Sequence, residues 1–452
     1  MFKKMKNPDK MPWYTLPAWA TRAVSLAANV IVLGYLTFYC TNILGMSATL
    51  VGTLLLVSKL FDGVTDLFAG ILIDKTNTRF GKARPYEFAI IGVWICTVLM
   101  FSCPELRVTG KAVWIFVTYT FVNSIFATLL NSSESVYIAR AIKLESDRNV
   151  LVSVNGLVVT LACTVISIIF PILMGTMGTS AGGWCTMILI FAVPLGMIGL
   201  GRFAFVKERK DAVSADIGQK IVLSEFMQAL GSNPFIFLLS GAGLIVTLIN
   251  SIGTAVGTYY FQYVVGDITL MGVVGMLGLV APFFLLFVPL LLKKISLSKL
   301  VIWGSAFGVI GNVLKAFAGA NLGILVAGNL ITTLSTLPLA YFGPIMVISC
   351  MDYSEWKIGK RIEGVFSSVN GFAAKVGAGL ASALVGIVMG AAGFDGTVAV
   401  QTTQVMNSII ALYSWIPAVM FIVIIILMRF YKLDDMMPQI QAELAQRRQA
   451  KQ

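Results

Sequence analysis

The sequence predicts an all-α polytopic membrane protein with twelve transmembrane helices in two six-helix, pseudo-symmetric bundles. Three observations lead to this fold class. Of the 452 residues, 58% are hydrophobic and 12% are charged, which is more apolar surface than a soluble domain can bury. Apolar segments of about 20 residues or more recur, each long enough to cross a hydrocarbon core about 30 Å thick. Lysine and arginine gather in alternate loops, as they do on one side of a membrane.

The apolar segments follow one another with short loops between most of them. We expect helices at residues 14–40, 48–73, 86–104, 111–137, 149–176, 183–206, 234–264, 269–292, 298–318, 321–351, 363–391 and 405–431.

The positive charge is distributed by side rather than spread over a surface. The loops opposite the basic ones hold only Arg107 and Lys111. The net charge of +12 is therefore a positive-inside signature and does not indicate nucleic-acid binding. We expect a multi-pass protein of the cell inner (cytoplasmic) membrane, surrounded by the lipid bilayer, with both termini in the cytoplasm. The first segment follows MFKKMKNPDK without a cleavage site, so we expect it to remain in the membrane.

Two short repeats divide the chain into halves. TFYCTNILG at 37–45 matches TYYFQYVVG at 258–266, and SVNG occurs at 153–156 and again at 368–371. Repeats in the same order with a charged linker between them are typical of transporters with two parallel halves. The expected domains are an N-terminal six-helix bundle at 1–206, a cytoplasmic linker at 207–231, a C-terminal six-helix bundle at 232–431 and a cytoplasmic tail at 432–452.

The composition argues against an enzyme. The chain has no histidine, which removes histidine-based acid–base catalysis and histidine metal sites. Its six cysteines fall in or beside apolar segments without metal-ligand spacing. We therefore expect no catalytic residues, no metal site and no cofactor.

Three ionisable residues share one stripe of the second predicted helix. Lys59, Asp62 and Asp66 stand at i, i+3 and i+7. A charge at the bilayer centre costs roughly 3 kcal/mol or more, so such residues normally face a bundle interior and mark an ion or substrate path. A structural ion pair between Lys59 and Asp62 is the alternative. One lysine neutralises only one carboxylate, which leaves a site for a cation.

Two long motifs carry a resemblance to a known family. The first runs from Asp62-x-x-x-Asp66 to Asp74-x-Thr76-x-x-Arg79-x-Gly81-Lys82-x-Arg84-Pro85-Tyr86, and the second is DYSEWKIGKRIEG at 352–364, followed by Lys375. They resemble the glycoside-pentoside-hexuronide:cation symporters, the melibiose permease-like branch of the major facilitator superfamily (MFS). The sequence departs from the family pattern at Leu67, Ser354 and Ile358.

The resemblance implies a secondary active transporter that works by alternating access and binds a coupling cation, Na⁺ or H⁺. It places the cation at Asp62, Thr65, Asp66 and Thr128. It also implies charged gating loops at the cytoplasmic helix junctions. The candidate gating residues are Asp74, Arg79, Arg84, Arg148, Asp352, Glu355, Arg361 and Glu363.

The polar residues of the apolar segments are candidate substrate ligands: Arg22, Asn29, Lys59, Asn131, Glu134, Asn155, Tyr341 and Lys375. Arg22 either faces the cavity or extends to the headgroups. Lys375 needs a carboxylate partner, for which Asp62 or Asp66 is the expected choice. Lys315, near the outer end of its helix, is expected to extend toward the headgroups.

The predicted cargo is a glycoside or hexuronide, and the protein is expected to function as a monomer. Two family features are missing: an acid near Ser25 in the first helix, and an arginine where Asn155-Gly156 stands. Both absences leave open an MFS carrier of a non-sugar substrate such as a lysolipid, or an uncoupled sugar facilitator. A membrane sensor or scaffold is a further alternative. The balance of cavity charges favours an anionic sugar slightly, because a bound cation adds a positive charge.

Overall fold

Helices make up nearly all of the chain that the computed structural model describes, which is residues 10–209, 231, 233–280, 283, 295–359 and 363–449. Contacts divide the chain into two compact units. The first comprises Met1–Ala215, Ile268–Leu279 and Asp395–Ala399. The second comprises Asp216–Asp267, Val280–Phe394 and Val400–Gln452.

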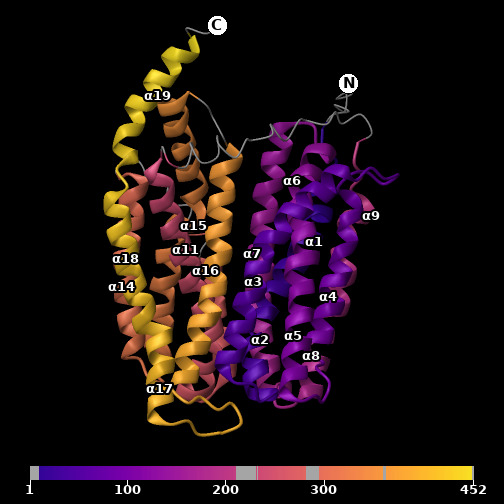
Figure 1. Cartoon of the computed structure of the whole chain (residues 1–452), viewed down its shortest axis with the longest axis vertical. Helices are drawn as coiled ribbons and strands as arrows, with labels where there is room; N and C mark the ends of the chain where they lie inside the picture. The colour runs from indigo at the N-terminus through magenta and orange to yellow at the C-terminus, as the bar shows by residue number, and fades with distance from the viewer. Residues whose placement is uncertain are drawn as a thin grey trace, which may run out of the picture. The chain divides into compact units, whose positions relative to one another are not determined.

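The helices of the first unit lie side by side (Figure 1). They are α1 Thr15–Gly34, α2 Leu36–Phe38, α3 Ala48–Lys75, α4 Ala89–Met100, α5 Val108–Thr120, α6 Thr128–Ala141, α7 Glu145–Met177, α8 Ala181–Gly199 and α9 Gly201–Phe205. Two π-helical segments, η1 Tyr39–Ile43 and η3 Phe121–Ala127, and the 3₁₀ turn η2 Arg84–Phe88 extend them. The segments η5 Ile268–Leu270, α12 Met271–Gly275 and η6 Met276–Leu279 pack against α7.

Local chemistry explains where these helices begin. Ser47 precedes α3 and its hydroxyl accepts from the backbone N–H of Leu50, while Ser180 does the same for Gly183 at the start of α8. An aromatic cluster then holds one end of the unit together. The ring of Phe101 lies 5.0 Å from that of Tyr39 and is stacked 5.5 Å from the ring of Trp184.

The second unit contains α11 Pro234–Tyr259, η4 Tyr260–Val265, α14 Leu297–Ala316, α15 Leu322–Ile358, α16 Glu363–Ala391, α17 Thr403–Ile410, η7 Ala411–Trp415, α18 Ile416–Phe430 and α19 Leu433–Gln449. Its core joins α11, α15, α18 and α19 through buried residues such as Ile236, Met346 and Ile424.

The tail helix α19 belongs to this core. Leu433, Ile440 and Leu444 are buried, and the Trp356 indole donates to a Glu443 carboxylate oxygen at 2.6 Å. The helix in the tail therefore has its apolar face against the second unit.

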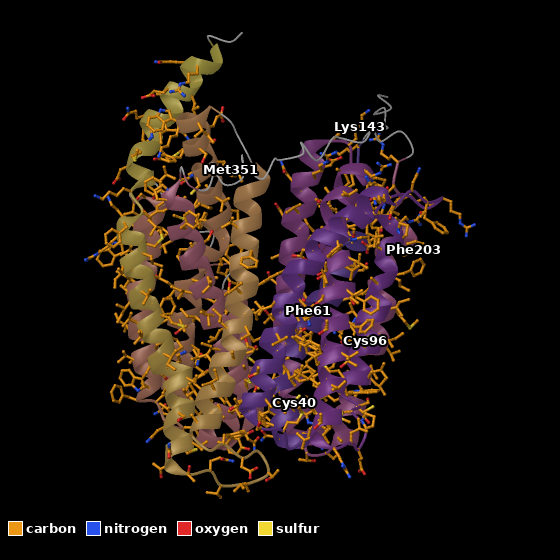
Figure 2. All side chains as sticks on the ribbon, viewed as in Figure 1. Cys40, Phe61, Cys96, Lys143, Phe203 and Met351 are labelled. Atoms are coloured by element: carbon orange, nitrogen blue, oxygen red, sulfur yellow. The ribbon has the colours of Figure 1, made fainter. Side chains whose placement is uncertain are left out.

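Among the described residues, nine helical stretches are long and apolar enough to span a membrane. The expected segment at 48–73 forms α3, the one at 86–104 forms η2 and α4, and the one at 269–292 is described to residue 280 and at 283. All six cysteines, two of which are labelled in Figure 2, are free thiols. The predicted all-α membrane fold is confirmed.

Candidate cation-binding and substrate-binding site

The two acids of α3 lie one turn apart, and both carboxylate oxygens of the first acid have a partner. Asp62 is 3% exposed. The Lys59 Nζ lies 3.2 Å from its Oδ2, and the Ser124 hydroxyl of η3 donates to its Oδ1. The Lys59–Asp62 ion pair that the sequence left open as an alternative is present.

Lys59 has further partners on the neighbouring helix. Its Nζ donates to the Asn123 side-chain carbonyl at 2.8 Å and lies 5.4 Å from the centre of the Tyr119 ring. The residue before Lys59 makes a contact between the same two helices, because the hydroxyls of Ser58 and Thr120 are 2.9 Å apart. Polar contacts therefore join α3 to α5 and η3 at membrane depth.

The second acid meets a hydroxyl. Thr128 Oγ1 lies 3.2 Å from Asp66 Oδ1 and 3.1 Å from the Asn123 backbone carbonyl, so its single proton is shared between two acceptors. Thr65 Oγ1 donates to the backbone carbonyls of Phe61 and Asp62 at 3.3 and 3.1 Å. A hydroxyl that donates to its own helix keeps its lone pairs, which can still coordinate a cation.

The three hydroxyl residues around the acids border an open groove. A cavity of about 420 Å³ between α3 and the η3–α6 helix is lined by Thr65, Ser124 and Thr128, by Lys75, and by apolar side chains such as Phe68 and Leu72. Carboxylate and hydroxyl oxygens are the ligands that hard cations prefer. The arrangement can hold one monovalent cation or a proton.

The π-helical turn of η3 aligns this side of the site. A π-turn inserts one extra residue, and such turns are common at functional sites. Here Asn123 accepts from Lys59 and Ser124 donates to Asp62, both on α3. Thr128, the first residue of α6, contacts Asp66 on α3 and the Asn123 carbonyl in the preceding turn. Asn123 and Ser124 were not among the predicted site residues, although two adjacent polar residues within an apolar segment could have indicated a polar contact there.

A second buried cluster links α1, η2, α6 and α9. The Glu134 carboxylate is bound by Arg22 and Arg202, and it accepts from the Trp19 indole at 3.1 Å. Glu87, which is wholly buried, lies 3.7 Å from Arg22 and 3.5 Å from Arg202. Two arginines and two glutamates make the cluster neutral.

Arg22 therefore does not extend to the headgroups, because its side chain is buried in this cluster. Arg202 lies 3.8 Å above the Trp19 ring and donates to the Trp19 carbonyl. Neither Arg202 nor Glu87 was among the candidate residues predicted from the sequence. Their positions at the ends of apolar segments concealed them.

The other candidate substrate residues are distributed over both units. In the first, Asn29 is buried and donates to the Thr97 hydroxyl of α4 at 2.7 Å, while Asn131 is exposed. Asn155 on α7 is partly buried, and its Oδ1 has no hydrogen-bond partner within the described residues. In the second, Tyr341 is exposed on α15 and Lys375 is partly buried on α16. The expected pairing of Lys375 with an acid of α3 remains a prediction.

The prediction that Lys315 extends toward the headgroups is wrong. It is 3% exposed in the second unit, with its Nζ 4.6 Å from the centre of the Tyr413 ring. Its helix turns it inward against α15 and η7, so it does not extend toward the headgroups.

The gating candidates of the first unit bind backbone at helix ends. Arg84 donates to the Phe203 carbonyl at 2.6 and 3.0 Å, and Arg148 donates to the carbonyls of Ile142 and Ala139. Arg79 is exposed, and Asp352 and Glu355 lie near the end of α15. Arg361 and the side chains of Asp74 and Glu363 lie outside the described residues.

Glu208 is a further charged residue that the sequence motifs did not indicate. It accepts from the backbone N–H groups of Lys82, Ala83 and Arg84 and from the Arg140 guanidinium. This one carboxylate holds the loop between α3 and η2.

Apolar spanning helices around a cluster of carboxylates, hydroxyls and one ammonium define a membrane transporter, and not an enzyme. The chain belongs to the MFS/sugar transport protein family, whose pattern matches residues 14–435. The resemblance predicted from the two motifs is thereby confirmed.

Individual proteins agree with this assignment. The isoprimeverose transporter of Lactiplantibacillus pentosus is 31% identical over 421 residues, covering 91% of this chain and 87% of the relative. The uncharacterized symporter YnaJ of Bacillus subtilis (strain 168) is 28% identical over 412 residues, covering 89% and 87%. A solved bacterial homologue of the human lysosomal transporter Spinster shares the fold, with a TM-score of 0.71 at 13% identity over 94% of this chain and 98% of that one.

Proposed function

We propose that this integral membrane protein is a secondary active transporter that couples entry of Na⁺ or H⁺ to symport of a glycoside or hexuronide by alternating access. The observation that carries the proposal is the oxygen cluster of Asp62, Asp66, Ser124 and Thr128 beside an open groove. The similarity to a relative named isoprimeverose transporter supports a small sugar as the cargo, and the similarity to YnaJ, which is named a symporter, supports symport. We further propose that the protein lies in the cell inner membrane with both termini in the cytoplasm and that it functions as a monomer.

Charge arithmetic supports a coupling role for the acid pair. The Arg22, Glu87, Glu134 and Arg202 cluster is neutral by itself. Lys59 pairs with Asp62, and the Asp66 carboxylate beside the Thr128 hydroxyl offers oxygens to a monovalent cation. Carboxylate oxygens stabilise a cation in a low-dielectric interior, where an uncompensated positive charge is costly.

The direct test is uptake into proteoliposomes under an imposed Na⁺ or proton gradient. We expect accumulation of a radiolabelled glycoside or glucuronide with one of the two gradients, and its loss in Asp66→Asn. Glu105→Gln, which changes an exposed acid in the loop before α5, should leave accumulation intact. Uptake that never exceeds equilibration under either gradient would identify an uncoupled facilitator instead.

A further inference from the structure

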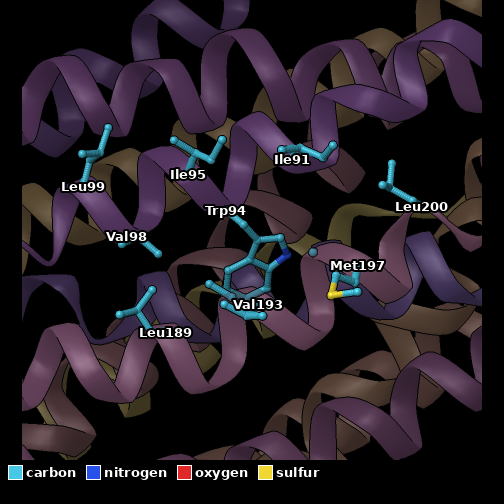
Figure 3. Close-up of a pocket in the computed structure, with 11 residues that line it drawn as sticks. Ile91, Trp94, Ile95, Val98, Leu99, Leu189, Val193, Met197 and Leu200 are labelled. Carbon is cyan, nitrogen blue, oxygen red and sulfur yellow. The ribbon is translucent and has the colours of Figure 1, made fainter.

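A second cavity of the first unit is unrelated to the acid pair. It has a volume of about 430 Å³ and lies between α4 and α8 (Figure 3). Its walls are apolar throughout, with Ile91, Ile95 and Val98 from α4 facing Leu189, Val193 and Met197 from α8. Several of these side chains are exposed, Met197 at 72%. In a spanning helix pair, such a groove opens toward hydrocarbon.

The groove is deep because of two residues. The Trp94 indole forms its floor and is fixed by donating to the Ser25 hydroxyl at 2.8 Å. Gly196 stands opposite, where an added Cβ would sit 3.5 Å from the Trp94 ring, an ordinary contact distance. A larger side chain at 196 would therefore occupy the groove rather than collide with the backbone.

An aromatic cluster lies beyond one end of the groove. Phe88, the last residue of η2, precedes Ile91 by three residues, and Phe203 of α9 follows Leu200 by three, so each stands about one helical turn beyond the groove lining. Their rings are 4.3 Å apart, and Phe80 lies 5.7 Å from Phe203. From Phe88 to Leu99 the face is about 16 Å long at 1.5 Å per residue, close to half of a hydrocarbon core of about 30 Å.

The aromatic end is positively charged. The Arg79 guanidinium lies 4.6 Å from the centre of the Phe80 ring, which is its only partner among the described residues, and Arg84 stacks on Phe203 at the same distance. The nearby Glu208 carboxylate is buried by Arg140 and three backbone N–H groups. An exposed arginine beside aromatic rings at the end of an apolar groove matches the phosphate and acyl chain of a lipid.

We propose that this groove binds one anionic phospholipid of the bilayer, with an acyl chain between α4 and α8 and the phosphate at Arg79. The length of the groove fits one leaflet, and the charge at its end selects an acidic headgroup over a zwitterionic one. The proposal is independent of the transported substrate.

Native mass spectrometry of the full-length protein in detergent tests it, with 1-palmitoyl-2-oleoyl phosphatidylglycerol and the phosphatidylcholine of equal chains as probes. We expect one retained lipid and a preference of about fivefold for phosphatidylglycerol. Both lipids offer the phosphate, so the preference arises from the net negative charge of the glycerol headgroup, which the choline ammonium cancels in phosphatidylcholine. Arg79→Gln should abolish the preference while keeping the lipid. Arg107→Gln, an exposed arginine in another loop, should keep both.

Filling the groove tests the acyl chain. Gly196→Val should lose retention of both lipids, whereas Gly182→Val, on the same helix with nothing within 4 Å, should not. If Gly196→Val does not fold, Val193→Trp replaces an exposed groove residue and serves the same purpose. Unchanged retention in the filled variants, or equal retention of both lipids by the unmodified protein, would overturn the proposal.

Discussion

Lys59 and Asp62 form a partly buried ion pair within a single helix, with 3.2 Å between Nζ and Oδ2. The pair fixes the first carboxylate of α3 without neutralising the second acid, one turn further along. Stability and coupling at this site are thus separable by mutation.

Asp62→Asn should lower stability, because it leaves the Lys59 ammonium among buried groups without its counter-charge. Breaking a fully buried pair from one side costs roughly 3 kcal/mol or more, and the partial exposure of Lys59 should reduce the loss here to about 1–2 kcal/mol. Lys59→Gln added to Asp62→Asn should recover most of that loss. Thermal unfolding of the purified variants in detergent measures both. Equal melting temperatures for the single and double variants would show that the pair contributes nothing.

Thr128 should set cation affinity through its hydroxyl. Thr128→Val keeps the shape but removes the oxygen 3.2 Å from Asp66, so we expect the cation concentration for half-maximal uptake to rise by about tenfold, the size of one charge-assisted contact. Thr128→Ser retains an oxygen and should stay near the unmodified value. Uptake measured against cation concentration distinguishes them; similar behaviour of Val and Ser would remove Thr128 from the site.

Arg202→Gln should destabilise the first unit more than any exposed arginine substitution. It deprives the wholly buried Glu87 and the partly exposed Glu134 of a shared partner, for which we expect a loss of about 3 kcal/mol. Arg107→Gln is the matched control. Unfolding midpoints in detergent compare the two, and equal midpoints would mean that Arg22 alone satisfies both glutamates.

A glucuronide should compete for uptake better than the matching glucoside. A bound cation adds a positive charge to a low-dielectric site, which an anionic cargo offsets. Inhibition of radiolabelled uptake by the two compounds provides the comparison. A clear advantage for the neutral sugar would contradict the charge argument and leave the transporter assignment standing.

Lys315→Met should be neutral or stabilising by about 1–3 kcal/mol. The ammonium is buried, and the Tyr413 ring is its only partner in the described part of the chain. Methionine fills similar space without the cost of burying a charge. Thermal unfolding is again the measurement. Lys315→Ala is the control, because it also removes the charge but leaves the space of the side chain empty. A large loss of stability in the methionine variant would show that the cation–π contact outweighs the cost of burying the charge.

Some site features could be predicted because they depend on local spacing. Lys59, Asp62 and Asp66 share a stripe by helical periodicity alone, and the ion pair joins residues three apart. Thr128 was also predicted, through the resemblance to the family. In contrast, Ser124 contacts an acid 62 residues away, and Arg202 contacts Glu87 across 115 residues. No local pattern specifies such partners.

The sequence by itself determined the membrane-spanning helices, the family and the acid pair of α3, because composition, motifs and helical period are properties of the chain. Only the tertiary structure decided which charges neutralise one another. Arg22 is buried against Glu134, Arg202 holds two glutamates, and Lys315 turns inward to Tyr413. Whether an ionisable side chain meets lipid, water or a partner depends on which face of its helix packs against which neighbour. In the η3 region a π-turn shifts that face, and the packing of distant helices fixes the rest.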